Sequence, residues 1–106
     1  MTGGVVIHTT AASHDEAERI AEALVSERLA ACVQIAAIRS RYVWKGAVER
    51  ADEQLLAIKT RAALFDAVRA RIRELSSYEA PEIIALPMIT ADPDYLAWLT
   101  AETREP

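Results

Sequence analysis

A long β-hairpin with a single turn is the feature that most constrains the fold of this chain. Strand-forming residues occupy Cys32–Trp44 and Val48–Lys59, and Lys45–Ala47 forms the turn because its glycine adopts positive φ without steric cost. Ala36-Ala37 interrupts the alternation and predicts a bulge or a bend. The hairpin is longer than a domain of 106 residues needs, and an isolated ribbon is only marginally stable. We therefore expect its outer half to project and to pack on another subunit.

The first third of the chain predicts a strand followed by an amphipathic helix. Every residue of Val5–Thr10 except His8 is β-branched, which favours a strand. Ser13 and Glu16 form an S-x-x-E capping box, which satisfies backbone N–H groups at a helix start. Apolar residues at i, i+3, i+4, i+7 and i+8 then predict one buried helix face, in a helix that ends at about Leu29. These residues are Ala17, Ile20, Ala21, Leu24 and Val25.

The last third predicts a helix, a strand and a terminal helix. Thr60 is expected to cap the first of these helices. Its inward residues are Leu64, Phe65, Val68, Ile72 and Leu75. Pro81 disfavours helix before it, so Glu82–Thr90 is predicted as a strand, with Pro87 marking a bulge or a sheet edge. Asp92-Pro93 then supplies an N-cap and a first helical residue.

The order of these elements is βαββαβ with an additional C-terminal helix. This order predicts an α+β, ferredoxin-like fold, in which two helices cover one face of an antiparallel sheet. The hairpin between the second and third strands is unusually extended. A length of 106 residues predicts one domain, spanning residues 1–106.

The composition of the chain limits which partners it can bind and in which cellular compartment it is expected. A net charge of −4 and a pI near 5.1 argue against general nucleic-acid binding, which neutralises phosphates with basic residues. The single cysteine, Cys32, cannot form an internal disulfide and suits a reducing cytoplasm. No signal peptide is visible, and no stretch approaches the roughly 20 apolar residues needed to cross a bilayer. We expect a cytoplasmic protein that binds neither nucleic acid nor membrane.

Cys32 is the candidate metal ligand. Apart from Met1 and Met88 it is the only soft ligand, and a thiolate favours Cu(I) or zinc. The alternative is a small buried hydrophobic residue, which is how free cysteine usually behaves. His8 and His14 belong to no CxxC, HxH or HExxH pattern, so no dedicated zinc site is indicated.

A cleft between subunits is a second candidate site. Two aromatic residues of the outer hairpin are predicted to meet polar residues of a neighbouring subunit, which suits a small ligand or a hard metal. The set comprises Tyr42, Trp44, Glu53, Lys59, Tyr78 and Glu79. The alternative is an inter-subunit salt bridge with aromatic packing.

No catalytic motif supports an enzyme or an organic cofactor. The chain has no GxSxG motif and, with 3 glycines, no glycine-rich phosphate loop. An enzyme that uses Lys59, Glu53 and Tyr78 remains a third hypothesis, which requires a strongly shifted lysine pKa in a cleft. We predict that the protein is not an enzyme.

Five phrases of the chain, in this order, resemble the CutA family of divalent-cation-tolerance proteins. They are Leu29–Gln34, Ser40–Gly46, Leu56–Thr60, Tyr78–Ile83 and Tyr95–Trp98, and they extend over most of the sequence. The resemblance implies a ferredoxin-like protomer in a tight, PII-like homotrimer, with sheets joined edge to edge and long hairpins that reach neighbouring subunits. It also implies a role in tolerance to copper and other divalent metals.

From this resemblance we expect that the protein forms a trimer and that its function is to bind copper or related divalent metals. The alternative is a PII-like signalling trimer that holds a small molecule in clefts between subunits. One departure concerns the metal. The family commonly has His-Pro before the Tyr-Glu pair, where this chain has Ser76-Ser77, and serine is a poor ligand for copper or zinc.

Overall fold

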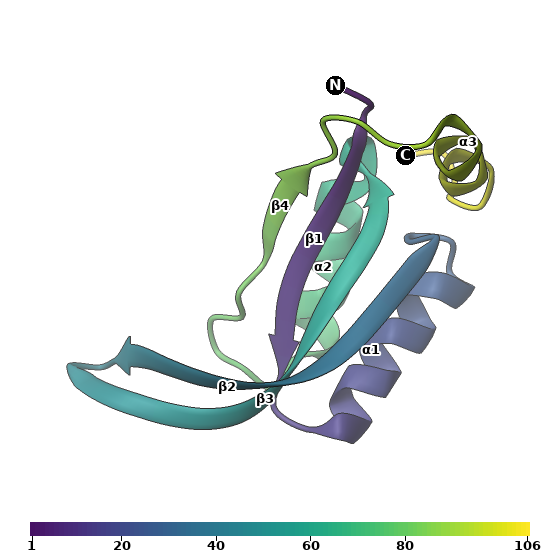
Figure 1. The fold of residues 1–106 in the computed structure, drawn as a ribbon. Helices are drawn as coiled ribbons and strands as arrows, with labels where there is room; N and C mark the ends of the chain where they lie inside the picture. The colour runs from purple at the N-terminus through teal and green to yellow at the C-terminus, as the bar shows by residue number, and fades with distance from the viewer.

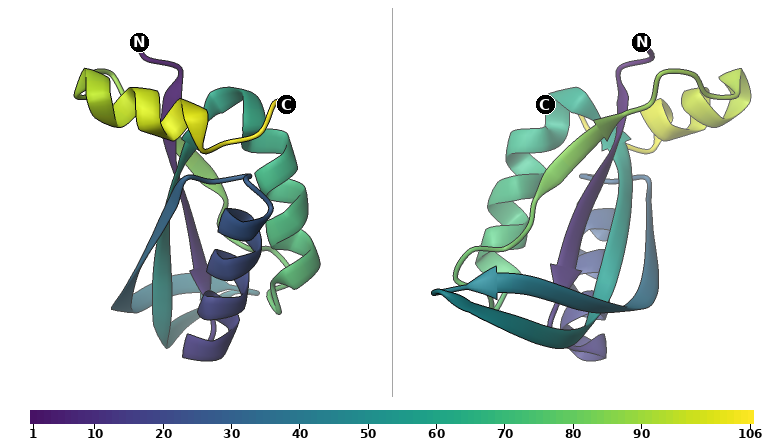
Figure 2. Two further views of the ribbon diagram at one scale, coloured as in Figure 1. Left: turned by 90° about the vertical axis from the view of Figure 1, so that its right-hand side faces the viewer. Right: turned by 60° about the vertical axis from the view of Figure 1, so that its left-hand side comes forward.

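The computed structural model describes all 106 residues as a four-stranded antiparallel sheet with the order β2-β3-β1-β4. Helices α1 and α2 lie side by side on one face of the sheet, and α3 lies at its end (Figures 1 and 2). The elements are β1 (Gly4–Ala11), α1 (His14–Ser26), β2 (Cys32–Trp44), β3 (Ala47–Arg61), a short 3-10 helix (Ala62–Leu64), α2 (Phe65–Leu75), β4 (Ile84–Pro87) and α3 (Pro93–Ala101). The predicted α+β, ferredoxin-like fold is confirmed.

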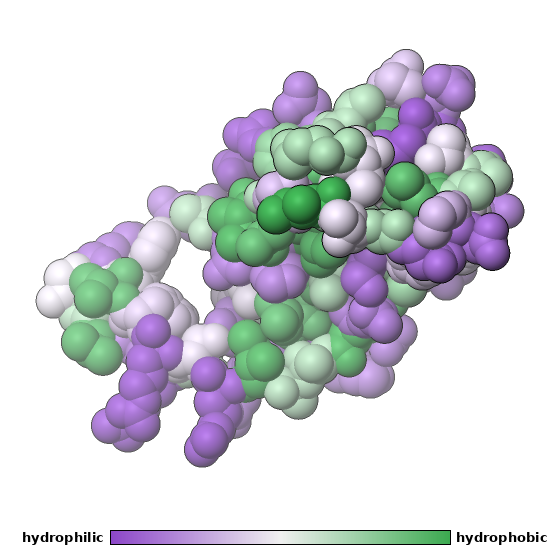
Figure 3. Space-filling model, turned by 45° about the horizontal axis from the view of Figure 1, so that its top comes forward, coloured by the Kyte–Doolittle hydropathy of each residue, from purple (hydrophilic) through white to green (hydrophobic).

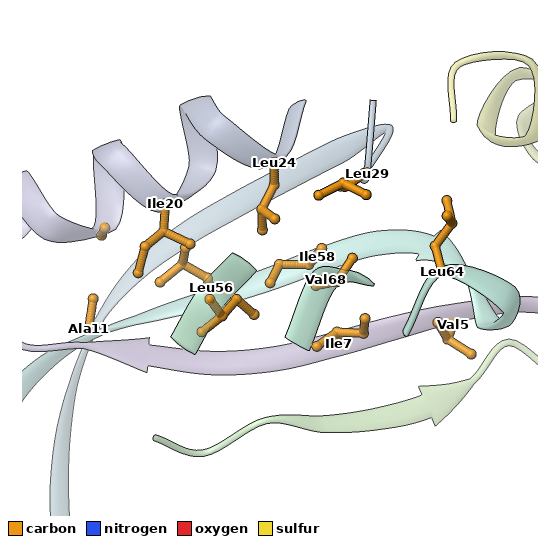
Figure 4. Packing of buried hydrophobic residues seen from close by; sticks show 13 residues of the cluster. Val5, Ile7, Ala11, Ile20, Leu24, Leu29, Leu56, Ile58, Leu64 and Val68 are labelled. Atoms are coloured by element: carbon orange, nitrogen blue, oxygen red, sulfur yellow. The ribbon is translucent and has the colours of Figure 1, made fainter. Parts of the chain in front are cut away.

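The hydrophobic core lies between the sheet and the two helices that cover it (Figure 4). Ile7 and Ile58, which pair across β1 and β3, are fully buried there. The helices contribute Ile20 and Leu24 from α1 and Val68 from α2, among others. Burial of side chains of this size contributes about 1.5–3 kcal/mol each and holds the sheet and the helix layer together. This core fixes the base of the hairpin on which the candidate site is built.

Helix α1 is shorter than its apolar pattern predicts. It ends at Ser26, because Arg28 takes a positive φ of 60° and the chain turns back. The carbonyl oxygen of Leu24 then accepts hydrogen bonds from the N–H groups of both Leu29 and Ala30. The prediction of helix to about Leu29 is therefore wrong by one turn.

The β2–β3 hairpin is regular throughout its length. Its register is unbroken from the Cys32–Lys59 pair to the Trp44–Ala47 pair, so no bulge occurs at Ala36-Ala37. The arms bend together instead, and the outer half leaves the body of the molecule (Figure 1). Lys45 and Gly46 form a two-residue turn with φ of 50° and 82°. The predicted projection of the outer half is confirmed.

Two further boundaries differ from the predictions. Thr60 lies inside β3 and caps no helix: its buried hydroxyl donates to the Leu29 carbonyl oxygen at 2.6 Å. Helix α2 begins at Phe65, after the 3-10 helix, without a side-chain cap. The strand predicted over Glu82–Thr90 is limited to β4, which is an edge strand as Pro87 indicated.

The start of helix α3 follows its sequence signal. The Asp92 carboxylate accepts hydrogen bonds from the N–H groups of Asp94 and Tyr95, and Pro93 is the first helical residue, which confirms the predicted cap. Leu99 is buried, while Tyr95 and Trp98 remain substantially exposed. None of the helices is long and apolar enough to cross a membrane.

Candidate functional site

A concavity of about 730 Å³ lies between the outer hairpin and the segment that precedes β4. Tyr42 and Trp44 of β2 line one side, and Tyr78 and Glu79 line the other. Glu53 of β3 is a buried member of the lining. Figure 3 shows the hairpin, at the left, standing away from the body with open space between them. The shape and the aromatic walls are typical of a small-ligand site.

A buried carboxylate and a phenol are bonded inside this concavity. Glu53 is only 7% exposed, and its Oε2 accepts a hydrogen bond from Tyr78 Oη at 2.6 Å. Burial, the hydrogen bond to Glu53 and the Glu53 charge together raise the pKa of Tyr78 well above its usual value near 10. Tyr78 therefore stays a protonated donor at physiological pH, and it holds the Glu53 carboxylate in place.

Glu16 anchors the segment that carries Tyr78. Its N–H donates to Ser13 Oγ at 3.2 Å, so the predicted cap is present on that side. Its buried carboxylate does not return to Ser13, however, but accepts from the N–H groups of Ala12 at 3.4 Å and Ser77 at 3.2 Å. The start of α1 thereby fixes the backbone next to Tyr78. The capping pattern gave no sign of this second role.

Lys45 lies beside two of the residues that line the concavity. Its Nζ lies 5.6 Å from the centroid of the Trp44 ring and 3.8 Å from Glu79 Oε2. Lys45 and Glu79 are both well exposed, so this ion pair contributes little to stability. It nevertheless shows that an ammonium group is accommodated near both the aromatic wall and the opposite carboxylate.

The raised pKa of Tyr78 predicts a pH-dependent stability difference. Tyr78→Phe leaves the buried Glu53 carboxylate without its donor, so we expect the variant to be less stable at neutral pH by about 1–3 kcal/mol. The advantage of the wild type is fully present below the unfolded-state pKa of about 10 and is lost as pH rises towards the higher folded-state pKa. Thermal midpoints of both proteins, measured between about pH 8 and 11, should keep a constant difference up to about pH 10 and approach each other above it. A difference that stays constant to the end of this range would contradict the prediction.

The structure gathers five of the six residues proposed for the cleft on one surface of a single chain. They are Tyr42, Trp44, Glu53, Tyr78 and Glu79. Lys59 lies elsewhere: it pairs with Cys32 across β2 and β3, and its Nζ donates to Gln34 Oε1. Whether a neighbouring subunit adds to this surface stays a prediction. Arg39 and Arg41 also line it, and sequence reasoning missed them although they alternate with Ser40 and Tyr42 on β2.

Cys32 stands alone as a soft ligand. It is a free, half-buried thiol at the start of β2. The pKa of Tyr95 is raised mainly by burial, and to a smaller extent by the charge of the nearby Cys32. No three His, Cys, Asp or Glu side chains come close enough to hold a metal ion. His14 lies 3.8 Å from Glu18 on the exposed side of α1 and joins no such group.

Comparison with known proteins identifies the family. Residues 5–102 match the family described as CutA1 divalent ion tolerance protein. The divalent-cation tolerance protein CutA of Thermus thermophilus is 42% identical over 92% of this chain and 96% of its own length. The chloroplastic protein CutA 1 of rice is 41% identical over 95% of this chain, which spans only 58% of that relative and 56% of a similar Arabidopsis protein.

Solved structures agree in fold. The structure of CutA1 from rice has a TM-score of 0.95 at 39% identity, with 100% of both chains covered. The divalent cation tolerance protein structure from Thermus thermophilus has a TM-score of 0.93 at 41% identity and covers 95% of this chain and 99% of its own. Sequence and fold therefore lead to the same assignment, and the chain belongs to the CutA1 divalent ion tolerance protein family.

Proposed function

We propose that this chain contributes to divalent-cation tolerance as a homotrimer, and that it acts by binding rather than by catalysis. The observation that carries the proposal is the family match, which extends from β1 to the end of α3 and is accompanied by the same fold. The Thermus and Pyrococcus relatives, named divalent-cation tolerance proteins, are matched over nearly their full lengths. The proposal is tested by comparing the copper tolerance of cells that lack this chain with that of the same cells after the chain is restored.

Exposed apolar surface supports self-association. Val43 and Val48 face each other near the hairpin tip and are 72% and 73% exposed. Ile84, Leu86 and Ile89, on and just after the edge strand β4, are also exposed. Soluble chains that present apolar strands in this way usually cover them with a partner. The three-fold symmetry of the proposed assembly is supported only by the resemblance to the CutA family.

Copper is the proposed metal, with the Cys32 thiolate as ligand. One thiolate is not a site, so several copies of the chain have to contribute, or other ligands have to come from outside it. Removal of a group that only hydrogen-bonds to a metal ligand weakens metal binding by about 10–100-fold, and removal of the ligand itself should cost at least as much. We therefore expect Cys32→Ser to weaken Cu(I) binding at least that much.

A competition titration with a Cu(I) chelator measures this affinity. His14→Ala is the control, because its imidazole is exposed and belongs to no ligand group, and it should bind like the wild type. Equal affinities of the wild type and Cys32→Ser would remove the thiol from the site. Circular dichroism checks that both variants remain folded.

A PII-like trimer that binds a small molecule is the second candidate function. The concavity with a buried carboxylate and aromatic walls favours it. A ligand that prefers the folded assembly raises its thermal midpoint. A thermal-shift screen of nucleotides, amino acids and small anions beside divalent metals separates the two functions, because a response to metals alone would count against the second.

The proposed location is the cytoplasm, since an unpaired thiol suits a reducing compartment. Two plant relatives are described as chloroplastic, and the Archaeoglobus fulgidus structure is described as a periplasmic protein. Fractionation of cells that express the natural gene tests the location of this chain.

A further inference from the structure

The Glu53 carboxylate is a buried acidic group in the concavity that has no ion pair. Tyr78 Oη is its only hydrogen-bond donor, although an ionised carboxylate has about four acceptor positions. No lysine or arginine of the chain forms an ion pair with it. Buried charges in proteins are normally paired because leaving water is costly. Glu53 thus lacks a cation.

The oxygen of Glu53 that makes no hydrogen bond is not sealed from solvent. Only Thr9 Oγ1 is both sealed from solvent and without a hydrogen-bond partner, so the unbonded Oε1 of Glu53 keeps contact with the space in front of it. Glu53 itself is more than nine-tenths buried and lines that space. A cation that enters from the solvent therefore reaches a preformed carboxylate, which Tyr78 holds in position.

The walls of the concavity favour an organic cation over a metal ion. Tyr42 and Trp44 present aromatic surface, which attracts ammonium and guanidinium groups. Lys45 already places an ammonium near both Trp44 and Glu79. A metal would need several ligands close together, and no group of three is present.

We propose that this concavity binds a small molecule with a guanidinium or primary ammonium group, which pairs with Glu53 Oε1 and packs against Tyr42. Arg39 and Arg41 line the same space and form no ion pair, so a carboxylate on the same molecule is also accommodated. The proposal rests on the second candidate function, whose ligand class it names. It is independent of the metal.

Calorimetric titration with L-arginine and L-citrulline tests the proposal on the full chain in its native assembly. The two compounds have nearly the same shape, but the ureido group of citrulline is uncharged. We expect arginine to bind at least about tenfold more tightly than citrulline, as for a hydrogen bond to a charged partner. We expect Glu53→Gln to weaken arginine binding by the same factor.

Two further variants keep the result interpretable. Asp52→Asn alters the exposed neighbour of Glu53 on β3, which does not line the concavity, and should bind arginine like the wild type. Tyr42→Leu removes an aromatic wall of the concavity without touching the core, and should weaken binding of arginine. It therefore tests the site even if Glu53→Gln fails to fold.

Three outcomes would overturn the proposal: no arginine binding, equal binding of citrulline, or wild-type arginine affinity in both site variants. If arginine does not bind and Glu53→Gln lowers the molar mass of the assembly, the missing cation comes from a second copy of the chain. Cu(I) binding by the same preparations, measured in parallel, reports separately on the metal function. Failure of the ligand proposal is therefore distinguishable from failure of the metal proposal.

Discussion

Ile58→Ala is expected to lower the free energy of unfolding by about 2–5 kcal/mol, the usual cost of truncating a fully buried isoleucine. Ile58 lies on the central strand β3, between Ile7 of β1 and Val33 of β2. It is fully buried and belongs to the core cluster between sheet and helices (Figure 4). The truncation leaves a cavity that these neighbours fill only in part. Urea unfolding at one fixed protein concentration measures the loss.

The matched control for this experiment is Val25→Ala. Val25 belongs to the apolar pattern of α1, yet it is exposed, so we expect its truncation to change stability by less than about 0.5 kcal/mol. Equal costs at the two positions would show that the core is not where the structure places it.

Val43→Glu combined with Val48→Glu is expected to dissociate the assembly. The two side chains are register partners near the hairpin tip and contact no core residue. Burial of a valine contributes about 1.5–3 kcal/mol, so loss of both weakens each interface by roughly 100-fold to 10,000-fold. Buried carboxylates add a further cost. Light scattering over a dilution series should find a lower molar mass than for the wild type.

Val25→Glu is the control for this double variant. It places a charge on another exposed valine, on α1 and outside the hairpin, and should leave the molar mass unchanged. Far-UV circular dichroism should show that the double variant keeps its secondary structure, because the outer hairpin contributes nothing to the core. A double variant that assembles like the wild type would exclude the hairpin tip from the interface.

The sequence predicts those parts of the fold that local chemistry decides. The hairpin turn depends on one glycine, the start of α3 depends on Asp92-Pro93, and both were predicted correctly. Thr60 was misassigned because threonine suits a cap and a strand equally, and its hydroxyl finds the Leu29 carbonyl only in the folded chain. Strand β4 covers only the four residues that pair with Val5–His8 of β1, and no local pattern reveals where this pairing stops.

The sequence predicts most of the residues of the candidate site but not how they are arranged. Tyr78 and Glu53 are 25 residues apart, and only the packing of the segment before β4 against the hairpin joins them. Lys59 was grouped with Glu53 although it lies six residues along the same strand, a separation of about 20 Å. The sequence predicts only a capping role for Glu16, while its carboxylate also holds the backbone of Ser77. Such contacts depend on tertiary structure.

The central claim is that the projecting hairpin of β2 and β3 packs on other copies of this chain. The most direct test is the molar mass of the purified wild type, measured by light scattering at micromolar concentration. The account predicts three times the 11.7 kDa of one chain. A well-folded protein with the mass of a single chain would contradict it.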